Sequence, residues 1–233
     1  MIFGAILAGG SGTRMQASMP KQFLTIGDAP VLIHTLRAFL DCKEIDHVLV
    51  GIPAVWMDYT RNLIDTYCPG AEVTLFPGGA TRTDTLFAAA DTAQNTFGAA
   101  PSDLLITHDA VRPFVTQQML LDNITAASED DACGTAIPAI DTILESDDGK
   151  YIAAIPPRTR MYQMQTPQTF NISALRAAFA SLTPAQQAIL TDGCGIFTAC
   201  GRKVRIVMGS TKNIKITTPP DLATANAFLA EKA

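Results

Sequence analysis

The first segment that could do chemistry follows an apolar run at the start of the chain. Residues 7–15 read Leu-Ala-Gly-Gly-Ser-Gly-Thr-Arg-Met, and Lys21 follows after Pro20. Glycines let a backbone bend sharply and bring N–H groups close to phosphate oxygens, and Arg14 and Lys21 add two cations. The spacing matches neither the dinucleotide-binding glycine pattern nor a Walker A loop. It favours a phosphate-binding loop, with a glycine turn flanked by surface cations as the alternative.

A second glycine-containing loop spans residues 77–85, Pro-Gly-Gly-Ala-Thr-Arg-Thr-Asp-Thr. Its backbone groups and Thr85 could contact a base and a ribose. The alternative is an ordinary helix start, with Thr81 or Thr83 as the N-cap. The pattern by itself favours the N-cap.

A carboxylate marks the third candidate loop, residues 107–113, Thr-His-Asp-Ala-Val-Arg-Pro. Asp109 at the end of a strand suits Mg²⁺, which needs only one or two carboxylates when substrate phosphates supply the other oxygens. Arg112 could hold a second anion. The alternative is a plain Asp–Arg pair in a turn. For His108, packing or hydrogen bonding behind the site is a more common role than that of a base.

The elements that must position these loops alternate along the chain. Apolar runs predict strands, and apolar residues at helical spacing predict the helices between them. This alternation is typical of a doubly wound, mainly parallel α/β sheet in a single domain, residues 1–233, with ligands beyond the carboxyl ends of the strands. Strands are predicted at 2–7, 47–53, 72–76, 103–107, 133–140, 203–208 and 213–217. Helices are predicted at 31–42, 55–67, 83–97, 117–128, 172–182 and from 221 onward.

Residues 141–165 interrupt this pattern. They contain Gly149 and Pro156-Pro157 and show no helical periodicity. We interpret them as a protruding β-arm, with a surface loop as the alternative.

Composition excludes several classes of protein. The net charge of −5 argues against a nucleic-acid partner, and five cysteines without a Cys-x-x-Cys pair argue against a zinc site or a disulfide framework. No apolar run approaches the roughly 18 residues of a membrane span, and the first residues do not form a signal peptide. We therefore expect a cytoplasmic protein that binds no membrane.

The three loops together resemble a known family. Residues 7–15 with Pro20-Lys21-Gln22-Phe23 resemble the signature of nucleotidyltransferases that activate sugar phosphates. Residues 108–113, 166–168 and 213–217 narrow the resemblance to the cytidylyltransferases, from Met1 to about Leu229. The resemblance implies Mg²⁺-dependent transfer of CMP from CTP to a sugar-alcohol phosphate. It also implies a homodimer in which each arm reaches the partner's site.

The resemblance assigns roles to individual residues. Residues that would bind CTP are Leu7, Ala8, Gly9, Gly10, Gly12, Arg14, Lys21, Gly79, Arg82 and Thr85. Residues that would bind the sugar-alcohol phosphate are Arg112, Thr142, Arg158, Thr166, Thr191 and Lys215, of which Thr142 and Arg158 would come from the partner's arm. Arg14, Lys21, Arg158 and Lys215 would be catalytic, and Asp109 would bind the metal.

Two branches of the family differ in the acceptor. Met161-Tyr162-Gln163 and residues 190–194 resemble the branch that makes CDP-ribitol more than the one that makes CDP-methylerythritol. Gln163 could hydrogen-bond an extra hydroxyl of the acceptor. Departures from the family pattern occur at Ala80, Met164 and Gly193. They bear on the choice of acceptor more than on the reaction.

Two other classes of protein fit less well. An NAD-dependent oxidoreductase would need the third glycine of the Gly-x-Gly-x-x-Gly pattern, where this chain has Met15, and an acidic residue at the end of the strand that reaches Pro53, which the chain lacks. A non-catalytic nucleotide-binding protein would have no need for Arg14, Lys21, Asp109 and Lys215 together.

Overall fold

The computed structural model describes residues 1–9 and 19–231. A seven-stranded sheet forms its centre, in the order β5-β4-β1-β6-β8-β7-β9. All neighbouring strands run parallel except β8, which is antiparallel to both β6 and β7. Its strands are β1 Ile2–Leu7, β4 His47–Ile52, β5 Val73–Pro77, β6 Leu104–Asp109, β7 Ala132–Pro138, β8 Tyr162–Asn171 and β9 Arg205–Met208. The predicted doubly wound, mainly parallel sheet is confirmed.

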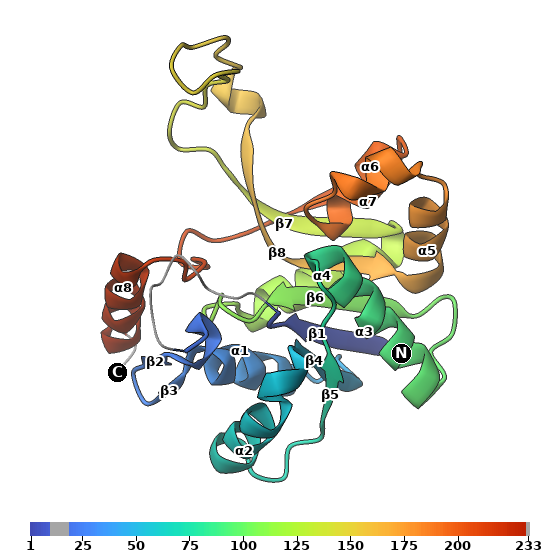
Figure 1. The fold of residues 1–233 in the computed structure, drawn as a ribbon, viewed down its shortest axis with the longest axis vertical. Coiled ribbons are helices and arrows are strands. Elements are labelled where there is room, and N and C mark those ends of the chain that lie inside the picture. The colour runs from blue at the N-terminus through green and yellow to red at the C-terminus, as the bar shows by residue number, and fades with distance from the viewer. Residues whose placement is uncertain (10–18, 232–233) are drawn as a thin grey trace.

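Helices cover both faces of this sheet (Figure 1). The α-helices are α1 Val31–Leu40, α2 Met57–Tyr67, α3 Arg82–Phe97, α4 Gln117–Glu129, α5 Ile172–Ala180, α6 Pro184–Ala188, α7 Gly193–Ala199 and α8 Pro219–Ala230. Short 3-10 helices are η2 Lys21–Phe23, η3 Ala54–Trp56 and η4 Arg158–Arg160. None of the helices in residues 1–9 and 19–231 is long and apolar enough to cross a membrane.

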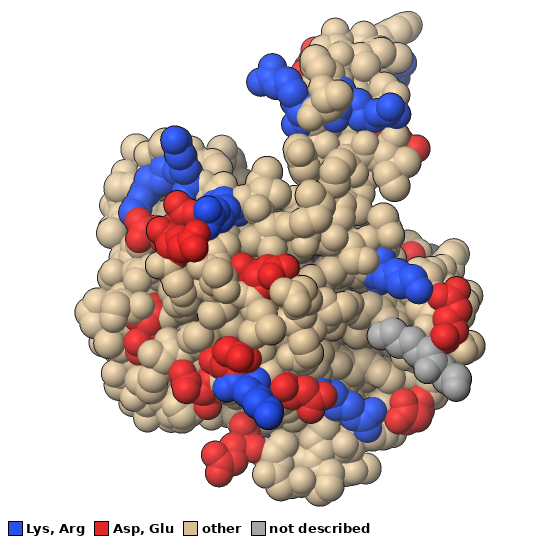
Figure 2. All heavy atoms as spheres, turned by 180° about the vertical axis from the view of Figure 1, so that it is seen from behind, with Lys and Arg blue, Asp and Glu red and all other residues tan. Residues whose placement is uncertain are grey.

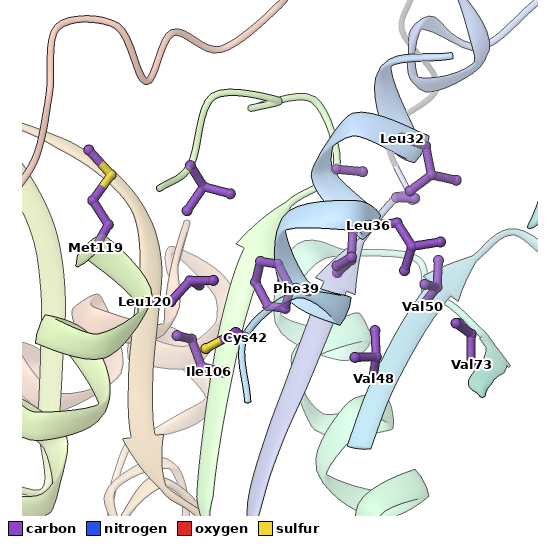
Figure 3. Close-up of a cluster of buried hydrophobic side chains, with 14 of the residues drawn as sticks. Leu32, Leu36, Phe39, Cys42, Val48, Val50, Val73, Ile106, Met119 and Leu120 are labelled. Atoms are coloured by element: carbon purple, nitrogen blue, oxygen red, sulfur yellow. The ribbon is translucent and has the colours of Figure 1, made fainter. Parts of the chain in front are cut away.

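One face of the sheet packs against α1, α2 and α4. Figure 3 shows Leu36 and Phe39 of α1 beside Val48 of β4 and Ile106 of β6, with Leu120 of α4 next to them. Leu36, Phe39, Ile106 and Leu120 are fully buried. Removing several such side chains from water supplies most of the driving force that holds this layer, at about 1.5–3 kcal/mol each.

The opposite face packs against α3, α5 and α7. Leu86 of α3, Leu175 of α5 and Phe197 of α7 are buried there with Phe3 and Phe170 of the sheet. A third, smaller cluster lies at the carboxyl end of the sheet. It joins the hairpin of β2 (Thr25–Ile26) and β3 (Ala29–Pro30) to α8 and to the segment before it. These packed layers fix the strand ends that carry the candidate site.

One predicted strand is absent, and several elements were not predicted. Residues 213–217 are not a strand, because the N–H of Ile216 binds the carbonyl of Val111 instead of joining a ladder. The pattern also gave no strand at β8 and no helices at α6 and α7. Other predicted elements appear with ends shifted by a few residues; β6 continues through His108 and Asp109.

The arm projects from the ends of β7 and β8, away from the helical layers (Figure 1). Between β7 and β8 its backbone holds one isolated bridge, Glu145 to Ala154, and the 3-10 helix η4. Residues 162–165 of the predicted arm segment belong to β8. Figure 2 shows basic side chains on the arm, whose lysine and arginines are Lys150, Arg158 and Arg160.

Candidate active site

Asp109 is the centre of the candidate site. Asp109 is the last residue of β6 and lies beside Leu7, the last residue of β1. Only 7% of Asp109 is exposed. Three cations surround its carboxylate: Lys215 Nζ lies 2.9 Å from Oδ2, Arg112 Nε 3.4 Å from Oδ2 and Arg82 Nε 3.5 Å from Oδ1. The sequence predicts a site at this end of the sheet. Four of the predicted site residues, Asp109 and these three cations, are in contact here.

The charge on Asp109 follows from these contacts. Burial alone would raise the pKa of this carboxyl, but the charges of Arg82, Lys215 and Arg112 outweigh burial and hold the pKa well below its usual value. Asp109 is therefore an anion at any physiological pH. Among residues 1–9 and 19–231, no group of three or more His, Cys, Asp or Glu side chains could cage a metal ion. A lone hard carboxylate suits Mg²⁺ that is shared with substrate phosphates.

Lys215 is positioned by the residues on either side of it. Ile216 is fully buried in the third cluster, and its N–H donates to the carbonyl of Val111 at 2.9 Å. Asn213, also fully buried, donates from Nδ2 to the carbonyl of Thr166 at 2.8 Å. With both sides anchored, the side chain of Lys215 is directed at Asp109.

The two arginines have further partners. Arg112 Nη1 donates to the carbonyl of Asn213 at 2.7 Å, which ties the turn after β6 to the Lys215 segment. Arg82, the first residue of α3, donates from Nη1 to Gln168 Oε1 at 3.4 Å. Its Nη2 is buried and has no hydrogen-bond partner in the part of the chain that is described. The guanidinium of Arg82 thus points at Asp109, and one of its donors is unpaired among the described residues.

The second glycine loop is held by Thr85. The hydroxyl of Thr85 donates to the carbonyl of Thr81 at 2.9 Å and accepts from the N–H of Gly79 at 3.1 Å. Thr81 caps α3 through a capping box with Asp84, as the N-cap interpretation predicts. A Cβ built on Gly9 would lie 3.6 Å from Thr85 Oγ1, so the first and second loops approach each other closely.

The ends of the first loop are fixed by two hydrogen bonds. The N–H of Ala8 donates to the carbonyl of Gly51 at 2.8 Å, and Gln22 Nε2 donates to the carbonyl of Ala8 at 2.8 Å. Gln22 therefore joins Ala8, at the start of the loop, to the residues that follow the loop. Three of the predicted CTP-binding residues, Gly10, Gly12 and Arg14, lie outside the described residues.

Lys21 belongs to η2 and is 8% exposed. Its charge acts on Asp221 in the first turn of α8: burial raises the pKa of Asp221, but hydrogen bonds from Thr218 and Thr217 and the charge of Lys21 lower it overall. Asp221 also accepts from the N–H of Thr217, two residues after Lys215. Lys21 therefore lies near the first turn of α8, which follows Lys215 in the chain.

Three predicted acceptor-binding residues stand outside the cluster that contacts Asp109 in the described chain. Thr191 lies between α6 and α7 and lines a hollow with Leu190 and Gly195. Thr142 and Arg158 lie on the arm and are exposed, and Arg158 Nη1 donates to the carbonyl of Ile140 at 3.0 Å.

Sequence reasoning did not single out the side-chain amides that support the site. These are Gln22, Gln165, Gln168 and Asn213. All four are buried. Gln22, Gln168 and Asn213 lie within the family motifs, and that position was the only signal that could have found them.

Comparison with known proteins agrees with this geometry. Residues 2–231 match the family model of IspD, 2-C-methyl-D-erythritol 4-phosphate cytidylyltransferase. The chain is 43% identical to the ribitol-5-phosphate cytidylyltransferase of Lactiplantibacillus plantarum, over the full length of both proteins.

Solved structures show the same fold. The 4-diphosphocytidyl-2C-methyl-D-erythritol synthase from Anaerococcus prevotii aligns over 99% of this chain and 96% of its own, with a TM-score of 0.81 and 31% identity. The 2-C-methyl-D-erythritol 4-phosphate cytidylyltransferase from Francisella tularensis aligns over 97% and 98%, with a TM-score of 0.79 and 26% identity. The family match, the full-length relative and the charged cluster at the sheet end lead to one conclusion: the chain belongs to the IspD family of cytidylyltransferases and is an enzyme that uses CTP.

Proposed function

We propose that this enzyme transfers CMP from CTP to D-ribitol 5-phosphate, with Mg²⁺, and releases pyrophosphate. The observation that carries the choice of acceptor is the full-length relative, 43% identical, whose name states ribitol 5-phosphate. The Met161-Tyr162-Gln163 segment favours the same branch. Methylerythritol 4-phosphate is the second candidate, because the family model and the solved relatives are named for it.

The reaction needs no general base, because the acceptor phosphate is already an anion at neutral pH. One of its oxygens forms a bond to the α-phosphorus of CTP, and the bond from that phosphorus to the β-phosphate bridging oxygen breaks. Both electrons of the broken bond leave with pyrophosphate. Catalysis therefore consists of positioning the two substrates and stabilising negative charge, the tasks of Lys21 and Arg14 at the α-phosphate.

The cations around Asp109 suit the acceptor phosphate. Lys215 and Arg112 lie on Oδ2 of the carboxylate, and Arg82 lies on Oδ1. Three positive charges on one carboxylate leave a net positive site that suits phosphate groups, with Lys215 and Arg112 available to the acceptor phosphate and Arg82 to CTP. Lys215 is the most accessible of the three, with a side chain that is 42% exposed.

Asp109 would hold Mg²⁺ together with oxygens of the triphosphate. Its lone, ionised carboxylate fits this shared mode of binding better than a cage built by the protein alone. When bound, the ion would offset charge on the triphosphate and hold it in line for attack. The backbone from Leu7 to Gly12, with Gly79, Arg82 and Thr85, would bind the rest of CTP.

The arm implies a second copy of the chain. Thr142 and Arg158 are exposed on a projection that leaves the sheet, and so are the apolar side chains of Ile140 (67%), Tyr151 (78%) and Ile152 (60%). Exposed apolar groups gathered in one segment mark an interaction surface. We assign the arm to a homodimer, in which Thr142 and Arg158 complete the partner's acceptor site beside Thr191 and Lys215.

A pyrophosphate-release assay tests the proposed function. CTP and Mg²⁺ are supplied with ribitol 5-phosphate or with methylerythritol 4-phosphate, and kcat/KM is compared. We expect a preference for ribitol 5-phosphate of at least about tenfold, because a site that hydrogen-bonds a hydroxyl discriminates strongly against substrates that lack it. A preference for methylerythritol 4-phosphate would reverse the assignment of the acceptor. Absence of pyrophosphate release with both would exclude this reaction.

A further inference from the structure

Two buried polar residues lie directly behind Asp109. His108 precedes it on β6 and is fully buried, and Thr166 on the neighbouring strand β8 is 4% exposed. The N–H of Asp109 donates to Thr166 Oγ1 at 3.1 Å, and Thr166 Oγ1 lies 2.9 Å from His108 Nδ1. His108 Nε2 lies 3.0 Å from the carbonyl of Arg112. These three contacts join both ends of the turn from Asp109 to Arg112.

The direction of each hydrogen bond follows from the chemistry of the groups. A carbonyl oxygen only accepts, so Nε2 of His108 carries the hydrogen that points at Arg112. The fully buried ring is neutral, because an uncompensated charge inside the protein is costly, and its Nδ1 is then an acceptor. The hydroxyl of Thr166 must therefore donate to Nδ1 while it accepts from the N–H of Asp109.

This direction decides what Thr166 can do. Its only hydroxyl hydrogen is used by His108, and a phosphate oxygen at neutral pH can only accept. A direct hydrogen bond from Thr166 to the acceptor phosphate would require breaking the contact with His108. We infer that Thr166 is a positioning residue: together with His108 it fixes the turn from Asp109 to Arg112, and it reaches the substrates only through those two residues. The inference rests on the proposed function, since that function gives Asp109 and Arg112 their roles.

Other hydrogen bonds hold the middle of the turn: the N–H of Ala110 donates to the carbonyl of Leu7 at 3.1 Å, and Thr35 Oγ1 donates to the carbonyl of Ala110 at 2.9 Å. The N–H of Arg112 donates to the carbonyl of Asp109 at 3.1 Å and closes the turn from within. The Thr166–His108 pair ties the same two residues to β8 and β6. Loss of the hydroxyl would leave the N–H of Asp109 and Nδ1 of His108 without their partner, so the carboxylate would lose its orientation. Substituting a residue that holds a metal ligand in place without touching the metal typically lowers metal affinity or activity by about 10–100-fold.

The test compares Thr166→Val, which removes the hydroxyl at nearly constant volume, with Thr166→Ser, which keeps it. Thr60→Val is the matched control, because Thr60 in α2 is fully buried and its hydroxyl has no partner in the described chain. Three quantities are measured for each variant: kcat, KM for the acceptor, and the affinity for Mn²⁺ in the presence of CTP, followed by the paramagnetic resonance of free Mn²⁺. The Mn²⁺ measurement does not depend on turnover.

For Thr166→Val we expect kcat and the Mn²⁺ affinity each to fall by about tenfold or more, with the acceptor KM changed by less than about twofold. Thr166→Ser and Thr60→Val should stay close to the wild type. A rise in acceptor KM with kcat and Mn²⁺ affinity intact would show that Thr166 binds the substrate directly. Equal damage in the serine variant would show that the methyl group, and not the hydroxyl, matters.

A second variant covers the case in which Thr166→Val does not fold. His108→Gln keeps a side chain that can donate to the carbonyl of Arg112 and accept from Thr166, and it should show the same pattern with a smaller loss. Unchanged Mn²⁺ affinity in a folded His108→Gln variant with low kcat would overturn the inference. If the wild type itself binds Mn²⁺ and CTP but releases no pyrophosphate with either acceptor, the proposed function fails, while the Mn²⁺ comparison still tests the positioning role.

Discussion

The carboxyl end of the sheet and the arm are built in opposite ways. Around Asp109, Arg112 and the amide side chains are buried, and Arg82 and the more exposed Lys215 also contact the carboxylate. Along the arm, nearly every residue from 140 to 161 is exposed, and one isolated bridge, Glu145 to Ala154, is the only strand pairing within this segment. The first region is organised by its own chain before any substrate arrives. The second has the side chains of an interface and needs another surface to organise it.

This contrast has an energetic basis. A buried charge is tolerated only with partners, so the cluster at Asp109 restricts its own geometry strongly. Exposed side chains restrict each other little, and exposed ion pairs contribute about 0–1 kcal/mol. Substitutions at the sheet end should therefore affect both chemistry and stability, and substitutions on the arm should affect chemistry with little effect on the stability of the subunit. Three predictions test this difference.

The largest effect is expected at Lys21. Lys21→Ala should cost about 3–4 kcal/mol of transition-state stabilisation, roughly 100-fold to 1,000-fold in kcat, because the ammonium would offset charge that builds up on the α-phosphate. Single-turnover kinetics with saturating CTP measure the loss. Lys212→Ala is the matched control, since Lys212 is an exposed lysine that pairs with Glu231 and lies three residues before Lys215 in the chain. Near-normal turnover in Lys21→Ala would remove this residue from the chemistry.

Sequence reasoning located the site because its signals are local. The apolar run of β6 ends in His-Asp, and the glycines of the first two loops follow strands, so the topology of a parallel sheet brings their ends together. The same reasoning placed most strands and helices. It proposed Asp109 and Arg112 from the loop itself, and Arg82 and Lys215 only with the help of the family resemblance. That these four contact one another came from the structure.

Two errors share one physical cause. β8 carries the polar run Tyr-Gln-Met-Gln-Thr-Pro-Gln-Thr, which lacks the apolar pattern of a buried strand, because Gln165, Thr166 and Gln168 are buried by hydrogen bonding. Residues 213–217 show the opposite case: Ile214 and Ile216 alternate like a strand, but Ile216 packs into the third cluster and Asn213 bonds to β8. Periodicity detects packing against a core. It does not detect a polar network.

The pH dependence of the free energy of unfolding should report on the buried end of the sheet, through His108. Burial lowers the pKa of His108 from 6.5 to about 4. Between these values the unfolded chain binds a proton that the folded chain does not, so the free energy of unfolding should decrease as the pH falls through this window. The loss attributable to His108 is about 3 kcal/mol at most.

Urea denaturation at pH 7, 6, 5 and 4.5, for the wild type and for His108→Gln, measures this loss. The variant should lose less stability across the window, by about one proton's contribution, whatever its stability at pH 7. Thr60→Val leaves His108 in place, removes no titratable group and should keep the wild-type slope. Identical slopes in the wild type and His108→Gln would show that the buried ring does not resist protonation.

The arm should show the smallest effect on stability and a distinct effect on activity. Arg158→Ala removes an exposed guanidinium whose one described hydrogen bond is to the carbonyl of Ile140, so the free energy of unfolding should change by less than about 1 kcal/mol. Turnover should fall by about tenfold to 100-fold if Arg158 holds the acceptor phosphate in the partner's site. Urea denaturation and steady-state kinetics on the same preparation give both values.

Mixed dimers decide whether this loss acts across the subunit boundary. A heterodimer of Asp109→Asn with Arg158→Ala, isolated through two different tags, contains one site with an intact Asp109 and an intact partner arm, so it should regain about half of the wild-type activity per dimer. The control heterodimer carries both substitutions on one chain and none on the other. If arms act on the partner, each of its two sites lacks one of the two groups and the control is inactive. If each arm serves its own chain, the pattern reverses, because the unsubstituted chain of the control keeps a complete site and the first heterodimer has none. That reversal would show that each arm serves its own subunit, so the arm would not depend on a partner as the comparison with the sheet end assumes.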